Sequence, residues 1–244
     1  MSSRIRFAVS LFAALVALAP AARAADAPPS DAAPATAAPA DDAGHRADLA
    51  AVIGTEGIGG QFSWLLVPHA LAVRVGANAF NYTHDLTSDD IHYVGKLKLS
   101  NQDLLLDWHP FSGWFRFSTG VVFDQNSLKL TGDAADSGGT YEFNGNTYSA
   151  AQVGTLSASV KFRAAAPYLG IGWSDSSTQA GLHFVADIGV VAQGTPKASL
   201  SASGSAANNA QFQSDLRAEQ AKLQDSLDAF RWYPVIQLGL GYRF

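Results

Sequence analysis

Ten ionisable residues lie on the polar side of a repeated alternating pattern, and their charges are the first chemistry that the sequence offers. Within each segment they stand an even number of positions apart, except that Lys98 and Asp103 are five apart, so extended strands place them on one face if that single change of phase is accommodated. They are Arg74, Lys96, Lys98, Asp103, Asp107, Arg116, Asp124, His183, Asp187 and Arg243. Because buried charges need partners, this nearly balanced set predicts either a salt-bridged interior or a narrow polar path for a charged solute.

Catalysis and metal binding have no comparable pattern. The chain contains no cysteine, which removes thiolate zinc ligands and cysteine nucleophiles. No two of the six histidines stand three to five positions apart, the usual spacing of zinc ligands. His183 and Asp187 share a face, but no adjacent His–Ser pair on a lipid-facing rim completes a lipid-modifying site. We therefore expect no catalytic residue, no metal and no cofactor, and an enzyme is the least supported class.

The segments that carry the ten residues alternate apolar side chains with small or polar ones. Residues 231–244 show this most clearly, since every second side chain from Trp232 to Phe244 is apolar and the others are mostly glycine or polar. An alternation with a period of two predicts β-strands. The same pattern recurs in 57–66, 70–82, 113–124, 166–174 and 181–193.

The composition of the polar face decides between a membrane barrel and a soluble β-sandwich. A sandwich face in water usually carries a dense mixture of Lys, Glu and Thr, whereas glycines and isolated charges predominate here. Such a face suits the narrow interior of a small barrel whose apolar face is turned to lipid. Aromatic residues gather at both ends of the strands, as interfacial girdles do. We favour the membrane barrel and keep the sandwich as the alternative.

Seven strands are clear, and a bacterial barrel is expected to have an even number. Residues 48–53, followed by a turn at Gly54–Gly57, supply the eighth. In 89–108 the apolar positions change parity, so we predict a β-bulge near Ser100–Gln102. The sequence thus predicts an all-β fold: an eight-stranded antiparallel transmembrane β-barrel with extended outer strands and one short loop helix.

The extended strands and the loop helix are predicted from segments that are longer than a membrane span or lie outside one. A tilted span needs about 9–11 residues, and 155–174 is about twice that length. Within the loop 132–154, Asn144-Gly145 is typical of a type I′ hairpin. Residues 210–229 have helical spacing, with Ser214 or Asp215 as the N-cap. This helix either caps the barrel rim, which we favour, or binds a partner.

The N-terminal residues direct export. Residues 1–24 have a basic start, an apolar core at Phe7–Ala19 and a small-x-small end at Ala22–Ala24, so we predict a signal peptide that is removed. Residues 25–46 are rich in Pro and Ala, so we predict a disordered tether there. Residues 47–244 are predicted to form the barrel. Removal of the signal peptide leaves 13 basic and 21 acidic residues, a charge of −8, which argues against nucleic-acid binding.

Four short motifs resemble those of one family of small porins. They are GTEGIGG at 54–60, APYLGIG at 166–172, GTP at 194–196 and WYPV at 232–235. They resemble the ornithine-uptake, carbapenem-susceptibility-associated outer-membrane porins, and the chain is broadly similar to barrels of the outer-membrane protein W type. The resemblance implies an eight-stranded barrel and uptake of basic amino acids, and it assigns no substrate residue.

From these patterns we expect a protein of the outer membrane of a Gram-negative bacterium, in contact with outer-membrane lipid. Its expected role is a narrow channel or uptake porin for a small solute, such as a basic amino acid. The alternative is a closed structural or interaction barrel whose extracellular rim binds a partner. The terminal Phe244, with apolar residues at alternate positions before it, resembles the C-terminal signal that barrel-assembly machinery reads.

Overall fold

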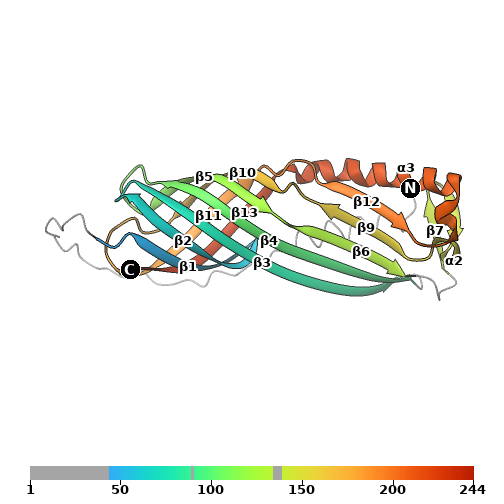
Figure 1. Cartoon of the computed structure of the whole chain (residues 1–244), viewed down its shortest axis with the longest axis horizontal. Helices are drawn as coiled ribbons and strands as arrows, with labels where there is room; N and C mark the ends of the chain where they lie inside the picture. Colours follow the sequence, from blue (N-terminus) through green and yellow to red (C-terminus); the bar gives the residue numbers. More distant parts are fainter. Residues whose placement is uncertain (1–43, 89–90, 134–138) are drawn as a thin grey trace.

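The computed structural model describes residues 44–88, 91–133 and 139–244 (Figure 1). The predicted signal peptide, 1–24, and nearly all of the predicted tether, 25–46, lie outside the described residues. Among the helices that the structure describes, none has the length and apolar character needed to cross a membrane.

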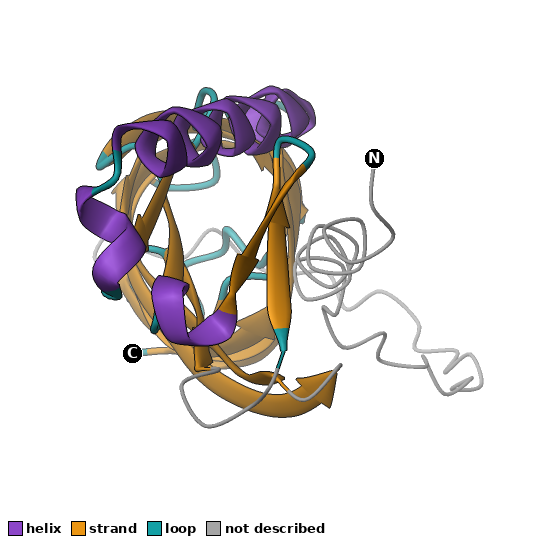
Figure 2. Ribbon diagram, turned by 90° about the vertical axis from the view of Figure 1, so that its right-hand side faces the viewer, coloured by secondary structure: helices purple, strands orange, loops and turns teal. Residues whose placement is uncertain are grey.

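Eight antiparallel strands close into a ring. In the order of pairing they are β4 (Ile91–Trp108), β3 (Leu71–Ser88), β2 (Gly57–Val67), β1 (Ala47–Gly54), β13 (Tyr233–Arg243), β11 (Gly181–Val191), β10 (Ala165–Trp173) and β5 (Phe115–Asp124). Pairing of β4 with β5 closes the ring, and Figure 2 shows it end-on. The predicted eight-stranded antiparallel barrel is confirmed, and 48–53 belongs to its first strand.

Large apolar side chains cover the outside of the ring. Leu238 and Ile188 are at least half exposed at mid-strand, and Phe184 is 70% exposed. Polar and charged side chains at the alternate positions are buried inside, among them Arg74 and Asp187. Trp64, Trp108, Phe111, Trp114 and Trp173 are exposed around the end with the tight turns. This inversion of the usual soluble arrangement is that of a barrel in lipid with an interfacial aromatic girdle.

Three short strands continue one side of the barrel beyond the ring. They are β6 (Ser127–Asp133), β9 (Leu156–Lys161) and β12 (Lys197–Ala202), which follow or precede β5, β10 and β11 along the chain. The far half of β4 pairs with β6, then β6 with β9 and β9 with β12. Together with the far halves of β3 and β4 they form the extension seen at the right of Figure 1, which confirms the predicted extended strands.

The β-bulge predicted near Ser100–Gln102 is wrong. Pairing between β3 and β4 runs without a shift from Leu71–Trp108 to Ser88–Ile91, so each strand keeps its parity. Above the ring the outer face carries the exposed Lys96 and Lys98, and the apolar Leu97 and Leu99 are half-buried on the inner side. The change in the apolar pattern therefore marks a change of surroundings and needs no extra residue in the strand.

A small cap closes the end of the extension. It contains the hairpin of β7 (Thr140–Phe143) and β8 (Asn146–Ser149), the helix α2 (Ala150–Val153), the 3-10 turn η1 (Ser205–Asn208) and the start of the helix α3 (Ala210–Ser226). From there α3 runs along the extension to the 3-10 turn η2 (Leu227–Arg231), which lies near the ring, where Gln193 donates to the carbonyl of Phe230 (Figure 1). The hairpin turns at Asn144-Gly145 as predicted. Its buried Phe143 packs with Phe212 of α3.

The helix α3 begins at Ala210, as the predicted segment 210–229 does, but neither Ser214 nor Asp215 is its N-cap, and it is fixed to the hairpin. Asn209 is its N-cap, and its side chain accepts hydrogen bonds from the first backbone N–H groups. Asp215, predicted as a possible cap, is instead a buried carboxylate within the helix. It accepts hydrogen bonds from Asn146 (2.8 Å) and Tyr148 (2.7 Å), among others. Since a carboxylate is a strong acceptor, this contact holds the hairpin against the helix.

Two glutamines of α3 cover the edge of β12, the last strand of the extension. The N–H of Ala198 donates to the side-chain oxygen of Gln224 at 3.0 Å, and the N–H of Leu200 donates to that of Gln220 at 3.2 Å. The Gln224 amide also donates to the carbonyl of Pro196 at 2.8 Å. Unpaired edge groups readily recruit another chain, and here a helix occupies them.

Replacement of Gln224 by Leu is expected to loosen α3 from β12. The variant leaves the buried N–H of Ala198 without its partner, which costs about 1–3 kcal/mol. Amide hydrogen exchange at Ala198 should become faster, while exchange in the ring stays unchanged. Asp225→Leu, at the exposed neighbouring position, is the control. Equal exchange rates at Ala198 in both variants would show that the glutamine does not hold the edge.

Candidate functional site

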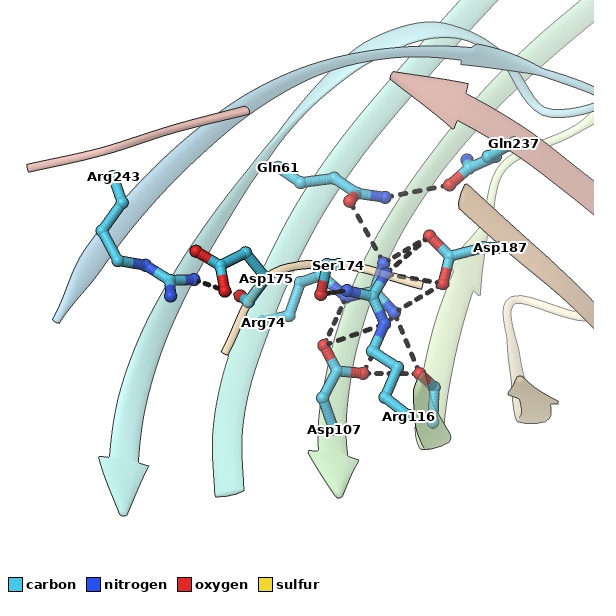
Figure 3. Close-up of polar contacts among 10 residues, drawn as sticks. Gln61, Arg74, Asp107, Arg116, Ser174, Asp175, Asp187, Gln237 and Arg243 are labelled. Carbon is cyan, nitrogen blue, oxygen red and sulfur yellow. Dashed lines mark hydrogen bonds and ion pairs between the residues drawn. The ribbon is translucent and has the colours of Figure 1, made fainter. Parts of the chain in front are cut away.

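Two arginines and two aspartates meet across the middle of the barrel interior (Figure 3). Arg74 projects from β3 and lies 2.9 Å from the carboxylates of both Asp107 on β4 and Asp187 on β11. Arg116 on β5 lies 2.8 Å from Asp187 and 3.8 Å from Asp107. All four side chains are at most 3% exposed. We call these four residues the central charge cluster.

Neutral polar groups complete the central charge cluster. The Ser118 hydroxyl donates to Asp107 at 2.6 Å and accepts from Arg74, and Ser174 accepts from Arg116. Close approach of strands β5, β10 and β11 requires Gly172, because a Cβ there would lie 2.7 Å from Oδ1 of Asp187. The cluster is thus neutral overall and has partners on several strands, as buried charge requires, while Nε of Arg74 and Nε of Arg116 make no hydrogen bond among the described residues.

A chain of hydrogen bonds joins the central charge cluster to the turn between β1 and β2. Arg74 donates to Gln61 at 3.1 Å, Gln61 donates to Gln237 at 2.9 Å, and Gln237 donates to Glu56 at 3.0 Å. Burial, together with the negative charges of Asp103 and Asp124, raises the pKa of Glu56 to about 8. Glu56 therefore carries a proton at neutral pH, at the end of the barrel that faces the extension.

Acidic and amide side chains predominate between the central charge cluster and the extension. Asp103 and Asp124 are buried with Asn78 and Asn101 on β3, β4 and β5, and the pairing register sets Asn78 beside Asn101 and Asn101 beside Asp124. Both polar atoms of Asn78 and one carboxylate oxygen of Asp103 have no hydrogen-bond partner among the described residues. Together with Glu56, this half of the interior offers three carboxyl groups and no basic side chain from the predicted set.

At the other end of the barrel, near the tight turns, a second polar group closes the interior. His183 on β11 lies 3.0 Å from the carboxylate of Asp48 on β1. Arg243 donates to the backbone carbonyls of Asp175 and Ser177 in the turn after β10. Burial and the positive charge of Arg116 lower the pKa of His109, in the turn after β4, to about 4, so this side chain is neutral at pH 7.

Two levels of the interior, on either side of the central charge cluster, hold little free space. A cavity of about 10 Å³ lies between the central charge cluster and the tight-turn end, which is room for about one water molecule. On the other side, buried Tyr168, Leu105 and Val235 form an apolar layer. Tyr168 lies so close to Gly189 that a Cβ there would be 2.3 Å from its hydroxyl oxygen. At these two levels side chains fill the interior, as expected for eight strands.

The structure brings together eight of the ten predicted interior residues and separates two from them. Arg74, Asp107, Arg116 and Asp187 form the cluster, and four more are buried above or below it: Asp103, Asp124, His183 and Arg243. Lys96 and Lys98 are instead exposed on the outer face of the extension. Their placement inside the lumen depended on the predicted bulge, and without a bulge their parity turns them outward.

Several residues that contact the buried charges were absent from the predicted set of ten ionisable residues, because they carry no formal charge or lie in a turn. Gln61, Ser118 and Gln237 occupy the same alternating face as the predicted residues, and that parity was the available signal. Glu56 lies in the turn after β1, where alternation does not apply. No group of three or more potential metal ligands occurs within the described residues.

A closed ring of eight antiparallel strands with an apolar exterior and a charged interior defines a small β-barrel of the outer-membrane type. The comparisons agree on this fold. The structure is similar to that of Acinetobacter baumannii CarO2, with a TM-score of 0.53 and 19% identity over 83% of this chain and all of that one. For Acinetobacter baumannii CarO the TM-score is 0.51, with 20% identity over 82% of this chain and 98% of that one.

At these identities the likeness shows the shared fold. No family model and no curated protein sequence matches the chain. The present chain covers 98–100% of these two Acinetobacter chains, so the shared fold extends over the whole barrel.

Proposed function

We propose that the protein is an outer-membrane channel that passes a small solute through its polar interior and is closed in the conformation described here. The central charge cluster carries the proposal, because it places two arginines and two aspartates across the lumen at 1–3% exposure. Opening would require these pairs to exchange partners with a passing charged group, without a change in the number of strands.

The free-energy cost of burying the central charge cluster favours a solute pathway over side chains that only fill the lumen. Buried ion pairs contribute no more stability than well-packed apolar side chains of similar volume, and apolar residues could fill a barrel of this width. Ionisable residues inside a membrane protein commonly line ion and substrate pathways. Hydrogen bonds join Glu56 to the central charge cluster, and the His183–Asp48 pair lies beyond the cluster toward the tight turns, an arrangement that is consistent with such a pathway.

The solute that fits best is small and positively charged. Glu56, Asp103 and Asp124 precede the central charge cluster on the side of the extension, so a cation entering there meets carboxyl groups first. Uptake of basic amino acids, implied by the family resemblance, fits this order of charges. The proposal therefore includes a basic amino acid as the solute.

The proposal also includes assembly in the outer membrane through the C-terminus. Phe244 is 52% exposed and follows Tyr242 and Leu240 on the outer, apolar face of β13. Its N–H donates to the carbonyl of Ala47, the first residue of β1, the strand with which β13 pairs. Such a position suits recognition by barrel-assembly machinery before the ring closes.

Electrical recording from the purified, folded protein in a planar bilayer tests the channel. We expect small currents with a preference for cations, and a weaker preference in Asp103→Asn. Proteoliposomes should take up lysine faster than glutamate. Bilayers that remain silent, together with equal uptake of both amino acids, would support the second candidate, a closed structural or interaction barrel. That candidate is favoured by the 10 Å³ cavity, which is too small for an amino acid.

Raising the pH from 7 to 9 is expected to increase the preference for cations. The pKa of Glu56 is raised to about 8, so ionisation in this interval adds a negative charge at the extension side of the lumen. Because the folded-state pKa is above the usual value, the contribution of protonated Glu56 to stability is complete below about pH 4.5 and is lost as the pH rises through about 8. Glu56→Gln should abolish the change in selectivity; a pH response that persists in this variant would assign it to another group.

A further inference from the structure

Five of the six lysines of the chain share the outer face of the extension. They come from four adjacent strands, β4, β6, β9 and β12, and all five are exposed: Lys96, Lys98, Lys129, Lys161 and Lys197. We call this surface the lysine face. It stands out because the chain as a whole is acidic.

The pairing register arranges the lysine face in two neighbouring rows. One row runs from Lys98 through Ser127 to Lys161 and Lys197. The other runs from Lys96 to Lys129 and continues through Ser159. Strands lie about 4.8 Å apart, so the first row spans about 14 Å.

Like charges lie directly opposite one another in both rows. Lys96 pairs with Lys129, and Lys161 pairs with Lys197. Like charges at directly opposed positions destabilise a sheet. None of the five lysines makes an ion pair with a described acidic residue. The acids on this outer face, Asp85 and Asp133, lie one and two rows further from the barrel. An external anion would remove the repulsion.

The height of the lysine face above the lipid-facing band indicates which anion it meets. On the outer face of β4, Trp108, Leu106 and Leu104 are exposed and apolar, and polar side chains begin at Gln102. Lys98 is four residues beyond Gln102, which is about 14 Å along the strand and about 10 Å along the membrane normal at a tilt of about 45°. The headgroup layer adds about 5–8 Å on each side of the hydrocarbon core, so Lys98 starts a few ångströms outside that layer, within reach of its phosphates.

We propose that the lysine face binds the phosphate groups of lipid headgroups in the outer leaflet around the barrel. The inference rests on the outer-membrane location proposed above and is independent of conduction. The long lysine stems let the ammonium groups reach down to the headgroups, and a row of about 14 Å can contact phosphates of neighbouring lipids. The extension therefore holds a shell of phosphorylated lipid on one side of the barrel.

The test is a titration of the folded protein, in nonionic detergent, with fluorescent lipopolysaccharide. The wild type is compared with a variant in which all five lysines are replaced by Gln. Lys222→Gln is the matched control, since this sixth lysine is exposed on α3. A lysine near an anionic surface contributes about fivefold to binding, so the five-lysine variant should bind at least about tenfold more weakly than the control. Increasing salt should reduce wild-type binding and have less effect on the variant.

Two further measurements distinguish binding of lipid phosphate groups from binding of other anions. Dephosphorylated lipopolysaccharide should bind the wild type as weakly as the phosphorylated form binds the five-lysine variant. Millimolar inorganic phosphate should compete poorly, because it cannot contact several lysines at once. The proposal is overturned if the five-lysine variant binds like Lys222→Gln, if dephosphorylated lipopolysaccharide binds equally well, or if inorganic phosphate displaces it completely.

Folding of the variant is checked by the difference in gel mobility before and after boiling. The five side chains are exposed, so this difference should be the same in the wild type and both variants. Because the titration measures no current, silent bilayers would refute the channel and leave this result unaffected.

Discussion

Replacement of Arg74 by Met is expected to lower the free energy of unfolding by about 3–5 kcal/mol. The substitution keeps much of the side-chain volume and removes the positive charge that lies 2.9 Å from both Asp107 and Asp187. Arg116 then remains as the only arginine of the central charge cluster against two buried carboxylates. Urea unfolding of the protein in lipid vesicles, followed by tryptophan fluorescence, measures the loss.

Restoring the charge balance provides the control. Combination of Arg74→Met with Asp107→Asn leaves Arg116 paired with Asp187 at 2.8 Å, so the double variant should lose less stability than the sum of the two single variants. If the double variant loses the full sum, or if Arg74→Met is as stable as the wild type, the cluster is not a coupled unit. Bilayer currents that increase in Arg74→Met would further support its role in closing the lumen.

Replacement of Leu238 by Arg is expected to cost about 2–4 kcal/mol. Leu238 is the central residue of β13, pairs with Ala186 and Ile53, and is 54% exposed on the apolar outer face. An arginine there would lie near the middle of the bilayer, where its charge is poorly solvated. The same unfolding assay, in vesicles of one lipid composition, measures this cost.

A second arginine variant, placed near the membrane interface, tests whether the cost of Leu238→Arg depends on depth in the bilayer. Gln125→Arg introduces the same side chain at an exposed position just after β5, close to the interface, where the expected cost is at most about 1 kcal/mol. Equal costs at both positions would contradict the assignment of the outer face to lipid.

The barrel itself could be predicted from the sequence because lipid imposes a simple rule on every spanning strand. Within the ring, alternate residues must be apolar, and strands such as β13 carry this pattern over their whole length. The interior charges follow from the same parity, which is why Arg74, Asp107, Arg116 and Asp187 could be assigned to one face before their contacts were known. Their particular pairs depend on the tilt and stagger of the strands, which alternation does not contain.

The rule stops at the membrane boundary, and the predictions for residues beyond it were less accurate. On β4 the apolar side chains change face between Leu104, which is exposed on the outside, and Leu99, which is half-buried on the inner side. A strand that leaves lipid for water produces the same sequence pattern as a β-bulge, and this ambiguity placed Lys96 and Lys98 inside. Asp215 was misassigned for a related reason, since its hairpin partners are distant in sequence.

The seam between β1 and β13 has a consequence for the time course of folding. It joins the two ends of the barrel sequence, with Asp48 opposite Arg243, so its contacts have the greatest sequence separation in the ring. Such non-local pairing is slow, because a long loop must close before any contact is gained. The ring cannot close until β13 has been translocated. Until then the apolar side chains of the earlier strands remain exposed to water. Protection of the waiting chain, more than the strength of any single contact, should therefore limit the yield of folded protein.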